Sequence, residues 1–204
     1  MQFAKDEIRQ RIVDAAREEF LEKGFEKASI RTITARAKTS KSNLYNYFKD
    51  KNELFYSVLE PTLAKIQKGL EAAKASGASK GEGSYAREAQ QRVIGTVMAF
   101  MAENLTDIKL LLFRAQGSSL ENFKNEVTDV FTDIMDSWVR SVSPDKEISR
   151  LFVRCVSNFY ISTVEQTILY GKAYGASKDQ FGKILKEFTD FVYNGWKGVF
   201  QQER

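Results

Sequence analysis

Residues 39–51, TSKSNLYNYFKDK, bring hydroxyls, amides, lysines and tyrosines together on one short stretch of chain. A helix buried in a core would not carry so many polar groups, and a plain solvated helix would not carry so many large apolar and aromatic side chains. Amides and lysines hydrogen-bond base edges in the DNA major groove, while hydroxyls and phenols reach phosphate oxygens. These residue types therefore favour recognition of a nucleic acid.

The charge distribution points the same way. Residues 27–51 contain seven lysines or arginines and one aspartate, a local net charge of +6, whereas the whole chain of 204 residues carries +4. A basic cluster on an otherwise balanced chain indicates a polyanionic partner at that place. A solvated basic face without a ligand is the alternative that charge alone leaves open.

Catalytic chemistry has little support in the composition. The sequence has no histidine, so Ser-His and Cys-His nucleophiles and imidazole-rich metal sites are excluded. The single cysteine, Cys155, is typical of a reducing cytosol, and its apolar neighbours predict a buried thiol. The N-terminus lacks the apolar segment of a signal peptide, and no run approaches the ~18 apolar residues of a membrane helix. We expect a cytoplasmic protein that is not an enzyme and has no cofactor or metal.

Three helices must position the polar stretch. Apolar residues recur every four positions from Ile8 to Phe20, which predicts an amphipathic helix that ends at Gly24. Ser29 and Ser40 are good N-caps for two further short helices that end near positions 37 and 48. Only Lys38 and Thr39 connect the two short helices. Two short helices joined by a short turn form a helix-turn-helix unit.

The last of these helices has two distinct faces. At about 100° per residue, Leu44 and Phe48 point the same way and form the inward stripe. The exposed arc then carries hydroxyl, amide, ammonium and phenol groups, from Lys41, Ser42, Asn43, Tyr45, Asn46 and Tyr47.

The rest of the chain is also helical in pattern. Asp50 opens a fourth helix that contains Pro61, near which we expect a kink. Further helices are predicted at about 85–103, 106–115, 119–142, 145–171 and 177–201, the fourth of them starting at Ser143-Pro144. The prediction is an all-α protein of about nine helices, with a helix-turn-helix DNA-binding head at residues 1–49 and a larger ligand-binding and dimerisation domain at residues 50–204.

The spacing of these residues resembles the tetracycline-repressor (TetR/AcrR) family of bacterial transcription regulators. The resemblance covers about residues 8 to 55, a quarter of the chain. It is carried by Ile12, Ala15, Ala16, Phe20, Gly24, Phe25, Ser29, Ile30, Arg31, Ile33, Ala37, Ser40, Lys41, Leu44, Tyr45, Tyr47, Phe48, Lys51 and Leu54. Lys38 stands where the family usually has glycine, so either Lys38 takes a positive φ and is mildly strained, or the turn differs.

The resemblance implies two kinds of DNA contact. Phosphate contacts are implied for Ser29, Tyr45, Tyr47 and Lys51. Contacts to base edges or the groove are implied for Arg31, Lys41, Ser42 and Asn43. Thr39 and Ser40, at the start of the recognition helix, could make either kind.

The resemblance also implies a homodimer and an effector pocket. Two-fold dimers read two half-sites on one duplex, and the family pattern places the interface on the last two helices, at Phe152, Tyr160, Ile168, Phe188, Val192, Gly195, Trp196 and Val199. The middle helices are expected to enclose a small-molecule effector, which the abundance of Phe and Met predicts to be apolar or aromatic. Candidate lining residues are Phe100, Met101, Glu103, Phe113, Arg114, Gln116, Phe131, Met135, Trp138, Asn158, Phe159 and Gln166.

These expectations describe a ligand-responsive transcriptional regulator. It would act as a repressor that binds a palindromic operator in double-stranded DNA as a dimer, and a small-molecule effector would release it. The alternative is a helical adaptor or ligand-binding protein whose helix-turn-helix head does not read DNA.

Overall fold

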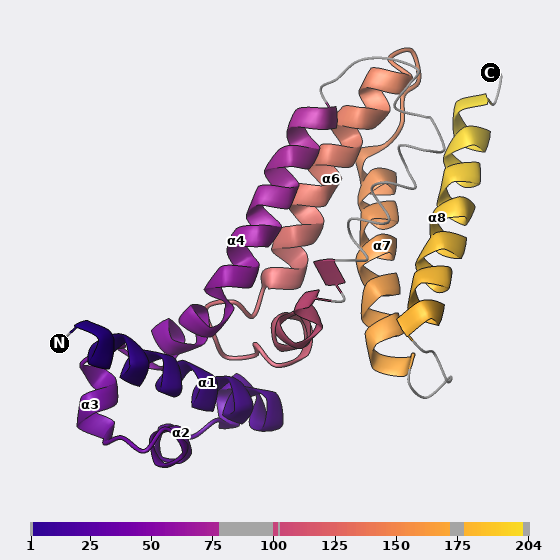
Figure 1. Cartoon of the computed structure of the whole chain (residues 1–204). Helices are drawn as coiled ribbons and strands as arrows, with labels where there is room; N and C mark the ends of the chain where they lie inside the picture. The colour runs from indigo at the N-terminus through magenta and orange to yellow at the C-terminus, as the bar shows by residue number, and fades with distance from the viewer. Residues whose placement is uncertain (1, 78–99, 102, 172–177, 202–204) are drawn as a thin grey trace. The chain divides into compact units, whose positions relative to one another are not determined.

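Helices dominate the described structure. The computed structural model of the chain describes residues 2–77, 100–101, 103–171 and 178–201, and no strand or membrane-spanning helix occurs in those ranges. The helices with defined bounds are α1 (Gln2–Lys27), α2 (Ile30–Arg36), α3 (Lys41–Tyr45), α4 (Lys51–Gly77), α6 (Phe123–Val142), α7 (Arg150–Tyr170) and α8 (Lys178–Gln201) (Figure 1). Residues 103–113 are also helical. The predicted all-α class is confirmed, while the helix predicted at 85–103 lies mostly outside the described residues.

The chain packs as two compact units. Unit 1 consists of Met1–Gln67 and Asn104–Lys124, and unit 2 consists of Lys68–Glu103 and Asn125–Arg204. α4 contributes residues to both units. The domain boundary expected at residue 49 stays a prediction.

α1 is broken where the sequence predicts. Ile12 and Phe20 are fully buried, as the four-residue period requires. Gly24 interrupts the helical backbone with φ 75°, which glycine adopts without the strain that a side chain would bring. The Phe25 N–H then donates to the carbonyl of Arg114 at 2.8 Å, so the break docks the end of α1 on a segment far along the chain.

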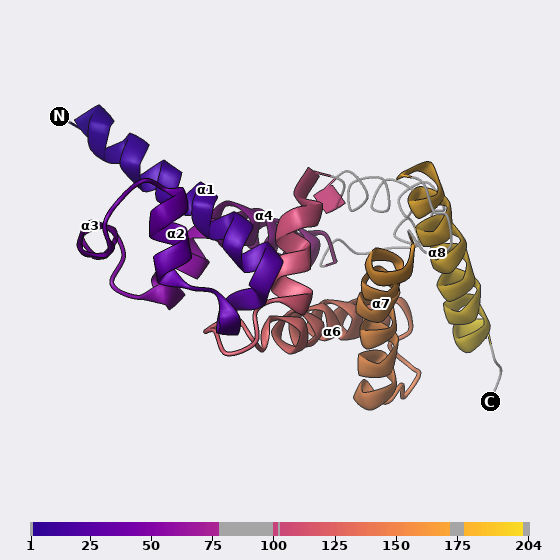
Figure 2. The same ribbon diagram turned by 90° about the horizontal axis from the view of Figure 1, so that it is seen from below.

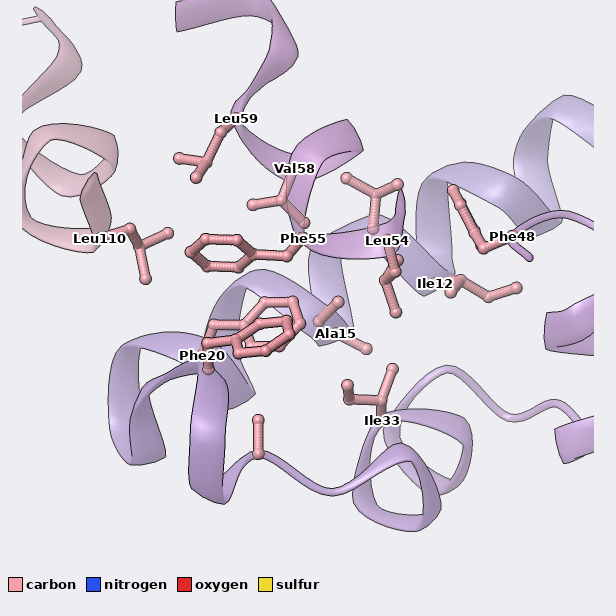
Figure 3. Packing of buried hydrophobic residues seen from close by; sticks show 14 of the residues in the cluster. Ile12, Ala15, Phe20, Ile33, Phe48, Leu54, Phe55, Val58, Leu59 and Leu110 are labelled. Atoms are coloured by element: carbon pink, nitrogen blue, oxygen red, sulfur yellow. The ribbon is translucent and has the colours of Figure 1, made fainter. Parts of the chain in front are cut away.

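Aromatic rings from α1 and α4 form the centre of unit 1 (Figure 3). The Phe55 ring packs edge-on against Phe20, with centroids 4.9 Å apart, and against Phe25, with centroids 5.2 Å apart. Leu110, from the helix at residues 103–113, is fully buried in the same cluster. Burying a Phe or Leu side chain contributes about 1.5–3 kcal/mol, so this cluster binds the helix at 103–113 to α1 and α4.

The start of α4 is capped in both directions. Asp50 Oδ1 accepts the backbone N–H of Glu53 at 2.9 Å, and Glu53 Oε2 accepts the N–H of Lys49 at 2.6 Å. This reciprocal pattern satisfies N–H groups that a helix start leaves unpaired, as the Asp-x-x-Glu spacing predicts. Pro61 lies inside α4, which continues through it to Gly77.

Unit 2 is held together by aromatic packing among α6, α7 and α8, of which α7 and α8 run side by side (Figure 1). Trp196 is 5% exposed; its ring stacks on Phe200 and lies edge-on to Trp138. Burial beside Phe131 and Phe188 raises the pKa of Tyr160 to about 12.

Two helices of the later chain begin after the predicted positions. α7 starts at Arg150, so the prediction of a start at Ser143-Pro144 was wrong. The Lys146 N–H bonds to the Ser143 carbonyl at 3.2 Å and closes a turn there instead. α6 starts at Phe123 rather than at residue 119 for a similar reason, because turns occupy residues 116–122.

Candidate DNA-binding surface

α3 carries polar side chains on the side that faces away from the core of unit 1. Figure 2 shows α3 beside α2. Ser40 caps α3, since its Oγ accepts the backbone N–H of Asn43 at 3.1 Å. Leu44 is fully buried and fixes the rotation of the helix about its axis. Lys41 and Ser42 are exposed on the other side. α3 ends at Tyr45, so it is shorter than the predicted helix to Phe48.

Two contacts order side chains of this arc. Asn43 Nδ2 donates to Thr39 Oγ1 at 2.8 Å. The Lys41 ammonium lies 5.9 Å from the ring centroid of Tyr45, and the Tyr45 side chain is 42% exposed. Side chains held in pairs lose less freedom on binding than free ones, so the arc is partly pre-organised.

The turn between α2 and α3 contains a strained residue. Lys38 has φ 50°, in the left-handed region, and no other described non-glycine residue has positive φ. The Thr39 N–H bonds to the Thr34 carbonyl at 3.0 Å and closes the turn. Of the two alternatives for this position, the structure has the mildly strained positive φ, with a lysine where the family usually has glycine.

The other residues predicted to contact DNA differ in their exposure and in the contacts that they make within the protein. Arg31 is exposed, whereas Tyr47 is half-buried against Phe48. The Ser29 hydroxyl makes no capping bond, although its residue is the N-cap of α2. Lys51 Nζ lies 3.2 Å from the carbonyl oxygen of Glu26 and 4.5 Å from the centroid of the Phe25 ring. The Lys51 ammonium therefore donates to a backbone carbonyl at the C-terminal end of α1.

Arg36, counted in the basic cluster, is exposed but paired with carboxylates of α1. Its guanidinium donates to Glu22 Oε2 at 2.9 Å and lies within 3.7 Å of carboxylate oxygens of Glu18 and Glu19. The bond with Glu22 raises the pKa of Arg36 and lowers the pKa of Glu22. Three nearby carboxylates on one helix turn were a sequence signal that this arginine would be paired.

A polar network that the sequence did not reveal links three helices of unit 1. Arg17 of α1 pairs with Asp107 and donates to the Val58 carbonyl at 2.7 Å. Asp107 Oδ2 also accepts the hydroxyl of Thr62, on α4, at 2.6 Å. Desolvation by burial lowers the pKa of Arg17. Pairing across such sequence distances carries no local pattern, so no sequence period could indicate it.

The predicted pocket residues fall in both units. Three belong to unit 1: Phe113, Arg114 and Gln116. The other nine belong to unit 2: Phe100, Met101, Glu103, Phe131, Met135, Trp138, Asn158, Phe159 and Gln166. Their convergence on a single ligand stays a prediction.

α7 and α8 border an open groove in unit 2. Its volume is about 720 Å³, and its lining is Phe159, Ser162, Thr163, Gln166, Thr167, Tyr170, Gly171, Gln180 and Ile184. A hollow of about 360 Å³ beside it includes Cys155 and Asn158. Cys155 is exposed, so the expectation of a buried thiol was wrong. It lies three residues after Phe152 and four before Phe159, which are both exposed, so it shares their side of α7 rather than the buried side of Val153.

The predicted dimer residues divide by exposure. Val192 and Trp196 are 6% and 5% exposed within the protomer, so they offer little surface to a partner. Phe152 is 44% exposed, and Gly195 has open space around it. The half-buried members of the set are Tyr160, Ile168, Phe188 and Val199. Five large side chains outside the set are more exposed than most of its members: Leu151, Phe159, Leu169, Tyr170 and Phe191.

Comparison with known proteins finds relatives for both parts of the chain. Residues 12–58 match the model of bacterial regulatory proteins of the tetR family. The chain is 23% identical over 196 residues to the HTH-type transcriptional repressor DhaR of Mycobacterium sp. (strain GP1), which covers 96% of this chain and 82% of that protein. A solved Clostridium perfringens protein assigned as a fatty acid metabolism regulator has a TM-score of 0.68 at 19% identity, over 91% of this chain and 97% of that one. The regulator FadR of Bacillus subtilis, solved with stearoyl-CoA, has a TM-score of 0.57 at 18% identity, over 87% and 95%.

Proposed function

We propose that the chain, whose residues 12–58 match the model of the TetR family of bacterial regulatory proteins, is a transcriptional repressor of this family. In this proposal it binds a palindromic operator as a homodimer and is released by a small-molecule effector. One observation carries the proposal. α3 buries Leu44 in unit 1 while Lys41 and Ser42 stay exposed, so a groove-sized helix offers hydrogen-bonding groups outward.

In this proposal the exposed arc divides its tasks. Arg31, Lys41, Ser42 and Asn43 read base edges, and each base-reading side chain contributes about 1–3 kcal/mol of discrimination. Ser29, Tyr45, Tyr47 and Lys51 contact phosphates, which sets the register and the salt dependence but carries no sequence information. Thr39 and Ser40 sit where the helix enters the groove.

A second copy of the chain supplies the second half-site. Phe152 and Phe159 on α7 and Phe191 on α8 are 44%, 49% and 67% exposed, an unusual amount of aromatic surface for a solvated face. We assign the interface to this surface rather than to Val192 and Trp196, because those two side chains are already covered within the protomer. Two recognition helices on one duplex then read a palindrome.

The proposed effector binds unit 2 and carries a long apolar part. The similar regulator FadR holds stearoyl-CoA, and the groove beside α7 and α8 combines the rings of Phe159 and Tyr170 with the hydroxyls of Ser162 and Thr163. Fatty acyl thioesters are therefore the first class of effector to test. A coupling free energy of about 1–3 kcal/mol would change operator affinity about 5–150-fold.

Pro61 is the proposed pivot of this response. It removes one backbone hydrogen bond from α4, the helix that contributes to both units. Replacing Pro61 by Ala should alter the response to effector more than it alters DNA affinity in the absence of effector.

Selection of bound sites from random duplex DNA by the full-length protein tests the proposal. A palindromic consensus, bound by a dimer and released on addition of a long-chain acyl-CoA, is the expected result. Binding to every duplex at low salt with no preferred site would instead support the alternative, a helical adaptor or ligand-binding protein whose head does not read DNA. A palindrome that no acyl-CoA releases would keep the DNA-binding proposal and remove the effector class.

A further inference from the structure

Glu19 places a buried carboxylate inside unit 1. Its side chain is 3% exposed, and it lies on α1 between the buried residues Ala16 and Phe20. A buried carboxylate loses its hydration, and this cost must be offset by hydrogen bonds or by opposite charge. The contacts that Glu19 makes therefore indicate what it does.

Those contacts reach both ends of α2. Glu19 Oε1 accepts the backbone N–H of Ser29, the N-cap residue, at 3.1 Å. Glu19 Oε2 lies 3.6 Å from the guanidinium of Arg36, the last residue of α2, and forms an ion pair rather than a hydrogen bond. Arg36 is held further by its bond to Glu22 at 2.9 Å. One carboxylate on α1 thus fixes the start and the end of the next helix.

The position of α2 controls the position of α3. α2 has seven residues, and a helix that short has little stability of its own, so its placement depends on packing and on its ends. Its last turn leads directly into α3, because the Ala37 N–H bonds to the Ile33 carbonyl at 2.9 Å and the Thr39 N–H to the Thr34 carbonyl at 3.0 Å. A shift at Arg36 would move Ser40, where α3 begins.

We propose that Glu19 is a positioning residue for DNA reading: by holding both ends of α2 it sets the angle at which α3 enters the groove. Arg36 is the second member of this clamp and serves it instead of contacting DNA. The inference rests on the proposed function, since it concerns how accurately the head reads an operator.

The test compares specific with non-specific binding in the full-length protein. The affinity for the duplex that the wild type selects and for a scrambled duplex is measured by fluorescence anisotropy at several salt concentrations. The variants are Glu19→Gln, Arg36→Gln and the double variant. Glu7→Gln is the matched control, because Glu7 is an exposed carboxylate of α1 that is not among the carboxylates paired with Arg36. Thermal unfolding is recorded for each.

If Glu19 has a positioning role, its loss lowers the ratio of the affinity for the selected duplex to the affinity for the scrambled duplex. Each single variant should lower it about tenfold, comparable to the loss of one base contact, and the double variant should lose no more than the singles, because both residues act through one clamp. The scrambled-duplex affinity and the salt slope should not change, since no phosphate contact is removed. The control should behave as wild type.

Other outcomes would overturn the inference. A lower melting temperature with an unchanged ratio would mean that Glu19 only stabilises the fold, and an additive double variant would mean that no clamp exists. If Glu19→Gln does not fold, Arg36→Gln decides alone, because the Arg36 side chain is 30% exposed and Glu19 keeps its bond to the Ser29 N–H. A wild type that selects no site overturns the proposed function itself, a result distinct from variants that keep the wild-type ratio.

Discussion

Individual side chains of the basic cluster have different tasks, which their charge does not reveal. The charge of Arg36 is offset by carboxylates of α1, whereas Lys51 donates to backbone carbonyls and keeps its positive charge. Arg31, Lys38 and Lys41 are exposed and make no ion pair within the described part of the chain. The charge available to DNA is therefore smaller than the net +6 of residues 27–51, and we expect a correspondingly shallow salt dependence.

Asn43→Ala should weaken binding to the selected operator by about 1–3 kcal/mol and relax the preference at one base pair. The helix cap survives, because Ser40 accepts the backbone N–H of residue 43 and not its side chain. Repeating the duplex selection with the variant measures the effect. Asn194→Ala, an exposed amide on α8, is the control. An unchanged preference at every position would remove Asn43 from the reading surface.

Tyr160→Phe should flatten the loss of stability at alkaline pH. Burial raises the pKa of Tyr160 to about 12, against about 10 in the unfolded chain. The folded state therefore favours the neutral phenol, and this contribution is intact below about pH 10 and lost as the pH rises towards 12. Urea unfolding between these pH values should show a steeper decline for the wild type, by at most about 1.4 kcal/mol per pH unit. Equal slopes would mean that the phenol ionises equally in both states.

The helix at residues 103–113 packs mostly with the N-terminal part of the chain, although it follows α4 in the sequence. Sequence reasoning assigned it to the ligand-binding domain, yet Leu110 and Leu111 are buried in the cluster that contains Phe20 of α1. Asp107 of the same helix pairs with Arg17. Any displacement of this helix would act directly on α1 and so on the DNA-binding head.

Asp107→Asn should lower the free energy of unfolding by about 2–3 kcal/mol, because it leaves the Arg17 guanidinium unpaired in a partly buried site. The expected loss is below that of a fully buried pair, since the Arg17 side chain keeps 30% of its exposure. The Asn carbonyl can still accept the Thr62 hydroxyl, so the change isolates the charge. Urea denaturation provides the measurement.

The control for this change is Asp6→Asn, at an exposed position of α1. It should change stability by less than about 0.5 kcal/mol. A similar small effect at Asp107 would show that the buried pair contributes nothing beyond its desolvation cost.

At the scale of the whole molecule, the exposed aromatic residues of unit 2 bear on whether the protein is a monomer or a dimer. Phe152, Phe159 and Tyr170 occupy one side of α7, at seven- and eleven-residue spacings, which a helix brings onto one line. Phe191 of α8 lies 6.4 Å from Phe159 between ring centroids and extends this face. A face of this kind is typical of an interface between subunits.

Phe191→Glu should therefore shift the protein towards the monomer. Each interface would place two charges in an apolar surface, so sedimentation should show dissociation at concentrations where the wild type is dimeric. Operator affinity should fall with it, because a monomer reads one half-site. Tyr56→Glu, an exposed aromatic residue of unit 1, is the matched control for oligomeric state. A variant that remains dimeric would place the interface elsewhere.

The sequence alone determined the features that depend on neighbours a few residues apart. The period of Ile12, Ala16 and Phe20 predicted the buried side of α1, the glycine at position 24 predicted its break, and Ser40 predicted the cap of α3. These features follow from helix geometry and backbone conformation, which are local.

Only the tertiary structure decided which polar groups are free. It paired Arg36 with carboxylates of α1, buried Glu19 against both ends of α2, and joined Asp107 to Arg17 across ninety positions of the chain. It also left Cys155 exposed, on the side of α7 that carries the exposed rings of Phe152 and Phe159. Partners of this kind are chosen by packing between distant segments, and no periodicity along the chain records that choice.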